Sequence, residues 1–244
     1  MTTSPTIANF ASKGRVTLEG DFLGPTLLTE WAGVAENSGT AAIVAAKAGG
    51  QVNLITGTSS GNRAHLWSGL NHLLSEGSGI VTFIASNRTS ILTRALFFGF
   101  TDVGTQETPI EISGTTVTAN AANAAGFVYD TGATSAIWYI QGVADTAATA
   151  LKAAVWNGDS SLVPVAETQD EFTIIVSSGD GSSGDLCDAT FYINGENVGT
   201  VKNAISNDVL LTPIANIETR TTAAMTLWVD YGFCESGRDR TPAD

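Results

Sequence analysis

The segment Gly57-Thr58-Ser59-Ser60-Gly61 has the GxSxG spacing that presents a nucleophilic serine between a strand and a helix. The chain contains 26 glycines, so short glycine motifs also arise by chance. The sequence lacks the alternation of strands and helices that an α/β-hydrolase requires. We therefore interpret this segment as a chance match and not as a nucleophile elbow.

A second glycine motif, Gly179-Asp180-Gly181-Ser182-Ser183-Gly184, matches the GxGxxG pattern of dinucleotide-binding loops. It leads into an expected hairpin instead of a helix, so no helix N-terminus would face a pyrophosphate. We predict a surface loop and no cofactor. Asp180, Asp185 and Asp188 could ligate Ca²⁺, although their spacing is not that of an EF-hand. We predict no metal site, and calcium stays an alternative.

Groups for acid–base chemistry are few. His65 and His72 have no HExxH frame and no nearby cysteine, which indicates structural or exposed histidines. Glu107 and Glu111 flank Pro109, but a glycosidase needs two carboxylates that face each other across a cleft. Sequence spacing does not establish such a pair. We predict no catalytic residue and expect that the chain is not an enzyme.

The tryptophans and cysteines have structural interpretations. Aromatic side chains in a β-sandwich lie mostly in the core, which we favour over a sugar-stacking platform. The five tryptophans are Trp31, Trp67, Trp138, Trp156 and Trp228. Cys187 and Cys234 lack CxxC spacing and are too few for a disulfide framework, so we predict buried thiols. A Cys187–Cys234 bridge is the alternative.

Composition excludes several classes of protein. The chain has 244 residues, 43% hydrophobic and 14% charged, which is incompatible with disorder. Its net charge of −13 makes nucleic acid a poor partner. No run of 18 apolar residues could span a membrane, and the first residues lack the basic and apolar regions of a secretory signal. We expect synthesis in the cytosol.

Apolar residues recur mostly with period 2 in short segments, which predicts an antiparallel β protein. The expected strands are Val52–Ile55, Gly79–Ala85, Ile91–Thr101, Ala125–Asp130, Ala136–Val143 and Phe172–Ser177. Asn194-Gly195 lies between two extended runs and predicts a hairpin with a type I′ turn. A final strand at Met225–Phe233 is expected to place one set of alternating residues on the core. This set is Met225, Leu227, Val229, Tyr231 and Phe233.

Some segments allow two interpretations. Asp145–Val155 is rich in alanine and Ala64–Leu74 has leucines at roughly helical spacing, so each fits a short helix or a strand. Leu92–Phe100 is apolar on both faces near its end, which indicates a central strand or one covered by a partner. Low charge and alanine runs such as Ala121–Ala125 also suggest assembly with neighbouring copies.

Taken in order, several segments resemble the concanavalin A-like (laminin G-like) jelly-roll domains of tailed-phage virion structural proteins, over roughly Val16 to Cys234. They are Asp21-Phe22, Gly57 to Asn62 with Ala64-His65-Leu66, Leu96 to Asp102, Ala125 to Asp130, Phe191 to Gly195 and Leu227 to Tyr231. The resemblance implies an all-β, two-sheet antiparallel β-sandwich with at most one or two short helices. The Glu-x-Asp-x-Glu run of related glucanases is missing, so no catalytic residue carries over.

These observations predict one domain at 16–234, an N-terminal arm at 1–15 and a C-terminal tail at 235–244. The expected function is that of a non-enzymatic virion protein, most simply a capsid decoration or head-associated protein. Its partners would be the major capsid protein, other virion proteins and its own copies, without nucleic acid or membrane. The alternative is a carbohydrate-binding module of a tail or head fibre that binds host glycans.

Overall fold

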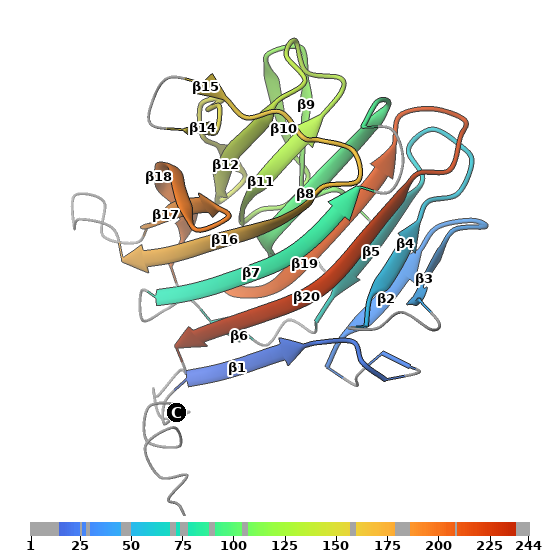
Figure 1. The fold of residues 1–244 in the computed structure, drawn as a ribbon. Helices are drawn as coiled ribbons and strands as arrows, with labels where there is room; N and C mark the ends of the chain where they lie inside the picture. The colour runs from blue at the N-terminus through green and yellow to red at the C-terminus, as the bar shows by residue number, and fades with distance from the viewer. Residues whose placement is uncertain are drawn as a thin grey trace, which may run out of the picture.

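The computed structural model of this chain consists of two large antiparallel sheets packed face to face (Figure 1). It describes residues 15–24, 26–27, 30–44, 50–68, 72–73, 78–87, 91–103, 107–156, 160–178, 186–207 and 209–237. These residues contain no helix, and so none that is long and apolar enough to cross a membrane. The prediction of an all-β, two-sheet antiparallel β-sandwich is confirmed.

The front sheet, nearer the viewer in Figure 1, joins strands from both ends of the chain. Its order is β18 (Glu196–Ser206), β17 (Leu186–Ile193), β16 (Gln169–Ser178), β7 (Ser78–Asn87), β20 (Thr226–Gly237), β4 (Val52–Ile55) and β3 (Thr40–Ile43). β1 (Arg15–Gly20) also pairs with β20, in a register from Arg15 opposite Gly237 to Gly20 opposite Gly232.

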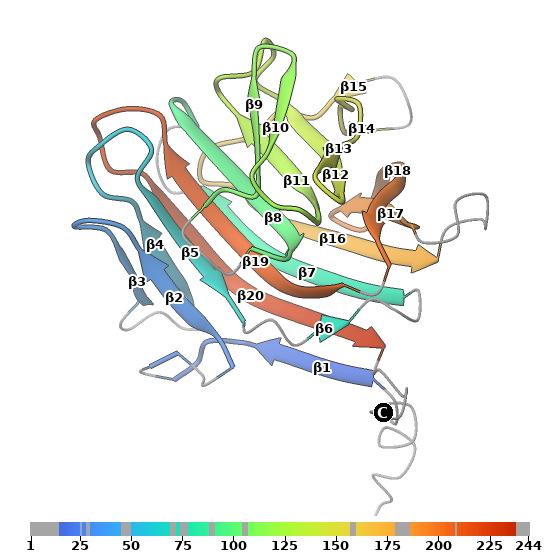
Figure 2. The same ribbon diagram turned by 180° about the vertical axis from the view of Figure 1, so that it is seen from behind.

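The back sheet faces the viewer in Figure 2. Its order is β13 (Ala147–Ala148), β12 (Trp138–Ala144), β11 (Ala124–Asp130), β8 (Arg94–Thr101), β19 (Leu210–Thr219), β5 (Arg63–Trp67) and β2 (Ala32–Ala35), and β6 (His72–Leu73) also pairs with β19. Two short ribbons complete the fold, β9 (Ile110–Ser113) with β10 (Thr116–Ala119) and β14 (Val155–Trp156) with β15 (Ser160–Ser161).

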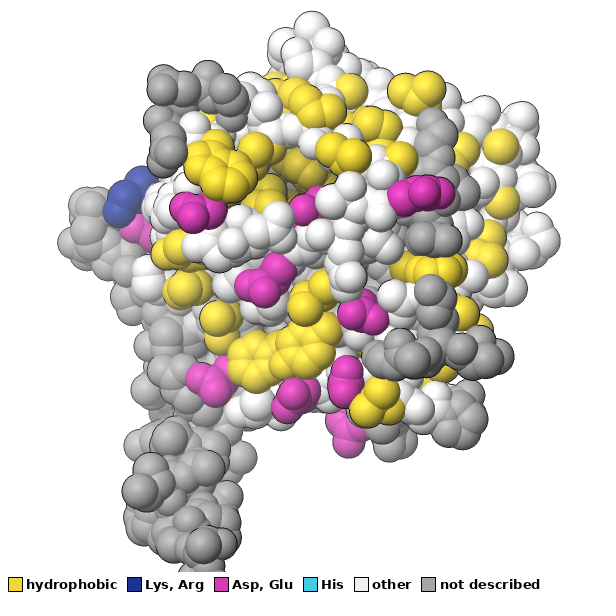
Figure 3. Space-filling model, in the orientation of Figure 1, with side chains coloured by type: hydrophobic (Ala, Val, Ile, Leu, Met, Phe, Trp, Pro, Cys, Tyr) yellow, Lys and Arg dark blue, Asp and Glu magenta, His cyan; other side chains and the backbone are white. Residues whose placement is uncertain are grey.

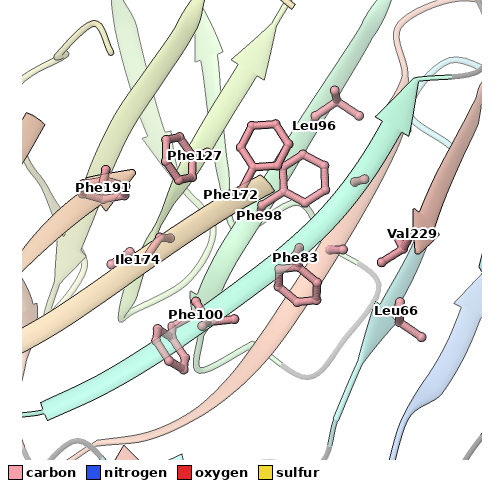
Figure 4. Close-up of a cluster of buried hydrophobic side chains, with 14 of the residues drawn as sticks. Leu66, Phe83, Leu96, Phe98, Phe100, Phe127, Phe172, Ile174, Phe191 and Val229 are labelled. Atoms are coloured by element: carbon pink, nitrogen blue, oxygen red, sulfur yellow. The ribbon is translucent and has the colours of Figure 1, made fainter. Parts of the chain in front are cut away.

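The main core lies between the sheets and is rich in phenylalanine (Figure 4). Phe98 of β8 stacks on Phe172 of β16, with ring centroids 4.6 Å apart and planes 12° apart. Phe127 of β11 meets Phe191 of β17 edge to face at 5.1 Å. Each pair joins one sheet to the other, so aromatic contacts fix how the two sheets pack.

A second, smaller core lies on the outer face of the back sheet, where the β9–β10 hairpin covers β8 and β11. Ile110 and Ile112 of β9 pack there with Phe97 and Val128, all of them buried. This packing explains why every residue of β8 is buried. The apolar second face of Leu92–Phe100 belongs to a central strand that the chain's own hairpin covers, and Ala121 and Ala124 belong to the same core.

The strands expected from period 2 are present, with ends that differ by a few residues. β4 coincides with the expected Val52–Ile55. The Asn-Gly turn between β17 and β18 is confirmed, because Asn194 and Gly195 have φ values of 52° and 79°. A type I′ turn requires this positive φ at both central positions.

The helical alternative is wrong at both segments that allowed it, as far as the structure describes them. In Ala64–Leu74 the chain forms β5 and β6, because Ala64 and Leu66 face the core with period 2. In Asp145–Val155 the chain turns from β12 into β13. Asp145 and Thr146 have φ values of 49° and 69°, which a right-handed helix does not allow.

The expected single apolar face of the last strand is wrong beyond Val229. A β-bulge lies between Val229, which pairs with Ala85, and Tyr231, which pairs with the adjacent Ile84. The extra residue reverses the alternation. Leu227 and Val229 face the core, whereas Tyr231 and Phe233 point to the outside and Gly232 and Cys234 take the inner positions. Trp31 fills the space beside Gly232, where an added Cβ would lie 2.9 Å from the indole ring.

Candidate functional site

Within the part of the chain that the structure describes, the largest group of buried and half-buried charges lies on the outer face of the back sheet, beside the β9–β10 hairpin. We call it the charged cluster, and its members come from β5, β9, β11, β19 and the turn after β19. They are Arg63, Glu111, Asp130, Glu218 and Arg220.

Arg63 contacts three carboxylates, two within the cluster and one outside it. Its Nε lies 2.8 Å from Glu218 Oε2, and its Nη2 lies 3.4 Å from Glu111 Oε1. The Arg63 backbone N–H donates to Glu36 Oε2 at 3.1 Å. Thr108 Oγ1 lies 2.6 Å from Glu218 Oε2, which gives this buried carboxylate a hydroxyl partner as well.

Arg220 holds the other half of the cluster. Its Nη2 and Nε lie 2.5 Å and 3.2 Å from the two oxygens of Asp130, and its Nη1 donates to Glu218 Oε1. Asp130 also accepts hydrogen bonds from the backbone N–H groups of Ile112 at 3.1 Å and Gly132 at 2.8 Å. Asp130 thus ties the hairpin to β11.

Burial and ion pairing act against each other in this cluster. Burial alone would lower the pKa values of Arg63 and Arg220, but their carboxylate partners raise both above the ordinary value. Burial raises the pKa of Glu218, while Thr108 and Arg220 act to lower it. Both arginines stay charged, and Asp130, Glu111 and Glu218 each have a guanidinium partner. For Glu218 the effect of burial is the larger one, and its pKa is raised above the ordinary value.

A pocket of about 290 Å³ opens beside the cluster. Glu111, Asp130 and Arg220 line it together with hydroxyl and backbone groups of the hairpin, at Ser113 and Thr118. Charged and hydroxyl groups on one wall can form hydrogen bonds with a small polar ligand.

The sequence alone suggested one member of this cluster, Glu111, as half of a carboxylate pair with Glu107. The structure exposes Glu107 and directs Glu111 to arginines instead. Arg63 and Glu218 are 155 positions apart and become neighbours through the register of β5 and β19. β19 was not among the strands expected from the sequence. The available signal was a set of polar residues at alternate positions, Asn216, Glu218 and Arg220.

The GxSxG segment lies in the turn between β4 and β5. Asn62 N donates to Ser59 O at 3.0 Å, and Gly61 N donates to Thr219 O at 2.7 Å. A strand follows the turn where a nucleophile elbow would need a helix, so the segment is not a nucleophile elbow.

The GxGxxG segment lies outside the described residues, as do Asp180 and Asp185. Asp188 is described, and its carboxylate binds Lys202 Nζ at 2.5 Å and the Asn203 backbone N–H at 3.0 Å. Among the described residues no group of three or more His, Cys, Asp or Glu side chains is placed to hold a metal ion.

His65 is buried on β5, opposite Asn216 of β19. Burial, and secondarily the nearby Arg63 charge, lowers the pKa of His65 to about 4. His65 Nδ1 and Asn216 Nδ2 have no hydrogen-bond partner among the described residues. His65 is therefore a neutral structural histidine at pH 7, and the side chain of His72 lies outside the described part of the chain.

The tryptophans divide between core and surface. Trp31 and Trp138 are buried in the main core, Trp67 and Trp228 are half-buried, and Trp156 is 42% exposed on β14. The prediction of buried thiols is confirmed, since Cys187 and Cys234 are both buried and no disulfide joins them.

Comparison with protein-family models and with curated proteins found no match. Solved structures do match. A Shewanella oneidensis MR-1 protein of unknown function, SO2946, has a TM-score of 0.61 at 12% identity. The match covers 100% of this chain and 98% of the SO2946 chain. The endo-β-1,4-glucuronan lyase of Trichoderma reesei has a TM-score of 0.58 at 10% identity. That match covers 91% of this chain and 95% of the lyase chain.

The carbohydrate recognition domain of Emp47p has a TM-score of 0.57 at 8% identity, over 91% of this chain and 95% of that domain. The fold is a concanavalin A-like β-sandwich. At these identities the likeness establishes the fold and nothing about activity.

Proposed function

We propose that this chain is a non-enzymatic structural protein of a phage virion, a capsid decoration or head-associated protein that binds capsid proteins and its own copies. The observation that carries the proposal is the unequal covering of the sandwich. The hairpin covers much of the back sheet, whereas the front sheet leaves apolar side chains at its outer surface, with Ile175 38% exposed. Exposed apolar side chains that gather on one face are typical of interaction surfaces.

The charged cluster supports the non-enzymatic part of the proposal. Its carboxylates bind arginines that are themselves partly buried, and Asp130 and Glu218 are almost without solvent contact. The sequence resemblance to phage jelly-roll domains supports the virion part.

The proposal is tested on purified particles of the phage that encodes the chain. We expect mass spectrometry to find the chain at a fixed copy number, and particles made without its gene to bind the purified chain in co-sedimentation. Absence of the chain from particles, together with failure to bind them, would overturn the proposal.

A second candidate function is glycan binding. The pocket beside Arg220 and Asp130 offers charged and hydroxyl groups, and Trp156 is exposed. Some structures with this fold bear names of carbohydrate recognition domains and polysaccharide lyases. A glycan array tests this candidate, with Thr118→Trp as the variant that fills the pocket from an exposed position. Glycan binding predicts array hits that this variant loses, and an array without hits removes the candidate.

A further inference from the structure

The outer surface of the front sheet, which we call the front face, carries an apolar patch made by three neighbouring strands. Ile175 of β16 lies beside Ile80 of β7, and Ile84 of β7 lies beside Tyr231 of β20, with Phe233 two residues further along β20. All five side chains point away from the core, and Figure 3 shows hydrophobic side chains on this face.

The bulge in β20 creates much of this patch. Without the extra residue between Val229 and its successor, Tyr231 and Phe233 would continue the inward set and lie between the sheets. The bulge turns both aromatic rings outward, and Gly232 and Trp31 complete the core in their place. Bulges that redirect side chains are common next to functional sites, because they set which groups face a ligand.

Carboxylates surround the patch. Glu19 of β1 lies opposite Phe233 and accepts a hydrogen bond from the Tyr231 hydroxyl at 3.2 Å. Glu171 lies opposite Ile84, and Glu235 lies opposite Ile80. Figure 3 shows acidic side chains in magenta among the yellow side chains of this face, with dark blue only at the left edge.

Positive charge is scarce on the same surface. Of the front-face side chains that the structure describes, Lys202 is a cation, and it lies on the edge strand β18. Its Nζ is 2.5 Å from Asp188 Oδ2, so a carboxylate of this chain already binds it. An acidic, apolar surface is complementary to a segment with basic and apolar side chains. A symmetric contact between two front faces would instead bring carboxylates together, which disfavours a second copy in that arrangement.

We propose that the front face, around Ile84, Tyr231 and Phe233, binds a basic and apolar segment of a partner protein, an inference that rests on the proposed function. The aromatic and isoleucine side chains supply the buried contact area. The carboxylates of Glu19, Glu171 and Glu235 bind lysine or arginine side chains at its edge.

The first test uses a synthetic peptide of alternating lysine and phenylalanine as the probe, with NMR mapping of backbone amides. We expect shift changes in β7, β16 and β20, and binding that weakens as salt is added. Glu19→Lys and Ile175→Ser should each weaken binding roughly tenfold. The matched controls are Glu196→Lys, at the start of the edge strand β18, and Val163→Ser, between β15 and β16. Both change exposed residues outside the patch and should have little effect.

Shifts spread over the whole surface, or equal losses in the control variants, would overturn the proposal. The second test joins carboxylates to lysines in intact particles with a carbodiimide and finds the joined residues by mass spectrometry. Cross-links from Glu19 and Glu171 to another virion protein support the front face. Particles that contain the chain but give cross-links only from other faces overturn this inference and leave the proposed function standing. Absence of the chain from the particles counts against the proposed function alone, and the peptide test then decides this inference.

Discussion

Arg220 binds both carboxylate oxygens of Asp130, with Nη2 2.5 Å from Oδ2 and Nε 3.2 Å from Oδ1. The planar guanidinium fork matches the carboxylate in a way that the single ammonium of lysine does not. Because Asp130 has no solvent contact, the ion pair with Arg220 offsets the free-energy cost of burying the Asp130 charge.

We therefore expect Arg220→Ala to lower the free energy of unfolding by about 3–5 kcal/mol, because it leaves Asp130 and Glu218 with less compensation for their burial. Arg220→Lys should recover part of this loss, since it restores the charge without the two-pronged geometry. Urea unfolding followed by far-UV circular dichroism measures both changes.

Lys202→Ala serves as the control for the Arg220 variants. The ammonium of Lys202 binds Asp188, but its side chain is 65% exposed, so the loss should stay below about 1 kcal/mol. If Arg220→Ala cost no more than this control, the cluster would not stabilise the fold as argued.

Local patterns in the sequence were sufficient for much of the fold. The alternation in Val52–Ile55 and the positive-φ requirement at Asn194-Gly195 depend on residues that are adjacent in sequence, and both predictions held. The bulge at Tyr231 was not predictable in this way, because the apolar alternation in the sequence continues through it unbroken. The inner position that it gives Gly232 lies against Trp31, which comes from the other end of the chain.

The charged cluster was beyond local patterns for the same reason. Glu218 gains its partners only when β19 pairs with β5 and the hairpin brings Glu111 and Thr108 close. Likewise, the second apolar face of β8 indicated a central strand or one covered by a partner. It is a central strand, and the hairpin at 110–119 of the same chain covers it. The partners of Glu218 and the cover on β8 both depend on the order of the strands, which no single segment of the sequence determines.

His65 gives the fold a defined dependence on pH. Burial lowers its pKa from 6.5 to about 4, so the unfolded chain binds a proton at this residue that the folded chain does not bind. Its contribution to stability is complete above pH 6.5 and is lost as pH falls toward 4. Two and a half pKa units correspond to about 3 kcal/mol over this range.

The measurement is the free energy of unfolding at several pH values for the natural chain and for His65→Gln. The carboxylates titrate in both proteins, so the difference between the two curves isolates His65. We expect that difference to shrink as pH falls from 6.5 to 4. Parallel curves would contradict a buried, neutral His65.

The two thiols are expected to be unreactive in the folded protein. Cys234 is fully buried in β20 and burial raises the pKa of its thiol, while Cys187 is buried in β17. Since the thiolate is the reactive form, both should react with iodoacetamide roughly 100-fold more slowly than free cysteine. Both should react after unfolding in guanidinium chloride. Ser113→Cys, at an exposed position, should react at the free rate, and fast labelling of the natural chain would show that these strands open.

The position of Gly232 after the bulge allows a prediction about its substitution. A Cβ at this position would lie 2.9 Å from two carbon atoms of the Trp31 ring, closer than packed carbon atoms approach. Gly232→Ala should therefore lower the free energy of unfolding by about 1–3 kcal/mol, because the indole must move within a packed core.

A double-mutant cycle with Trp31→Phe tests the cause of that loss. The smaller ring leaves space for the added methyl group, so Gly232→Ala should cost less in the Trp31→Phe background than in the natural chain. Gly24→Ala is the control, because its Cβ would lie 3.5 Å from the nearest atom, in ordinary contact, and should change stability little. If the two substitutions at Gly232 and Trp31 proved additive, the close contact between these residues would not determine which side chains of β20 enter the core.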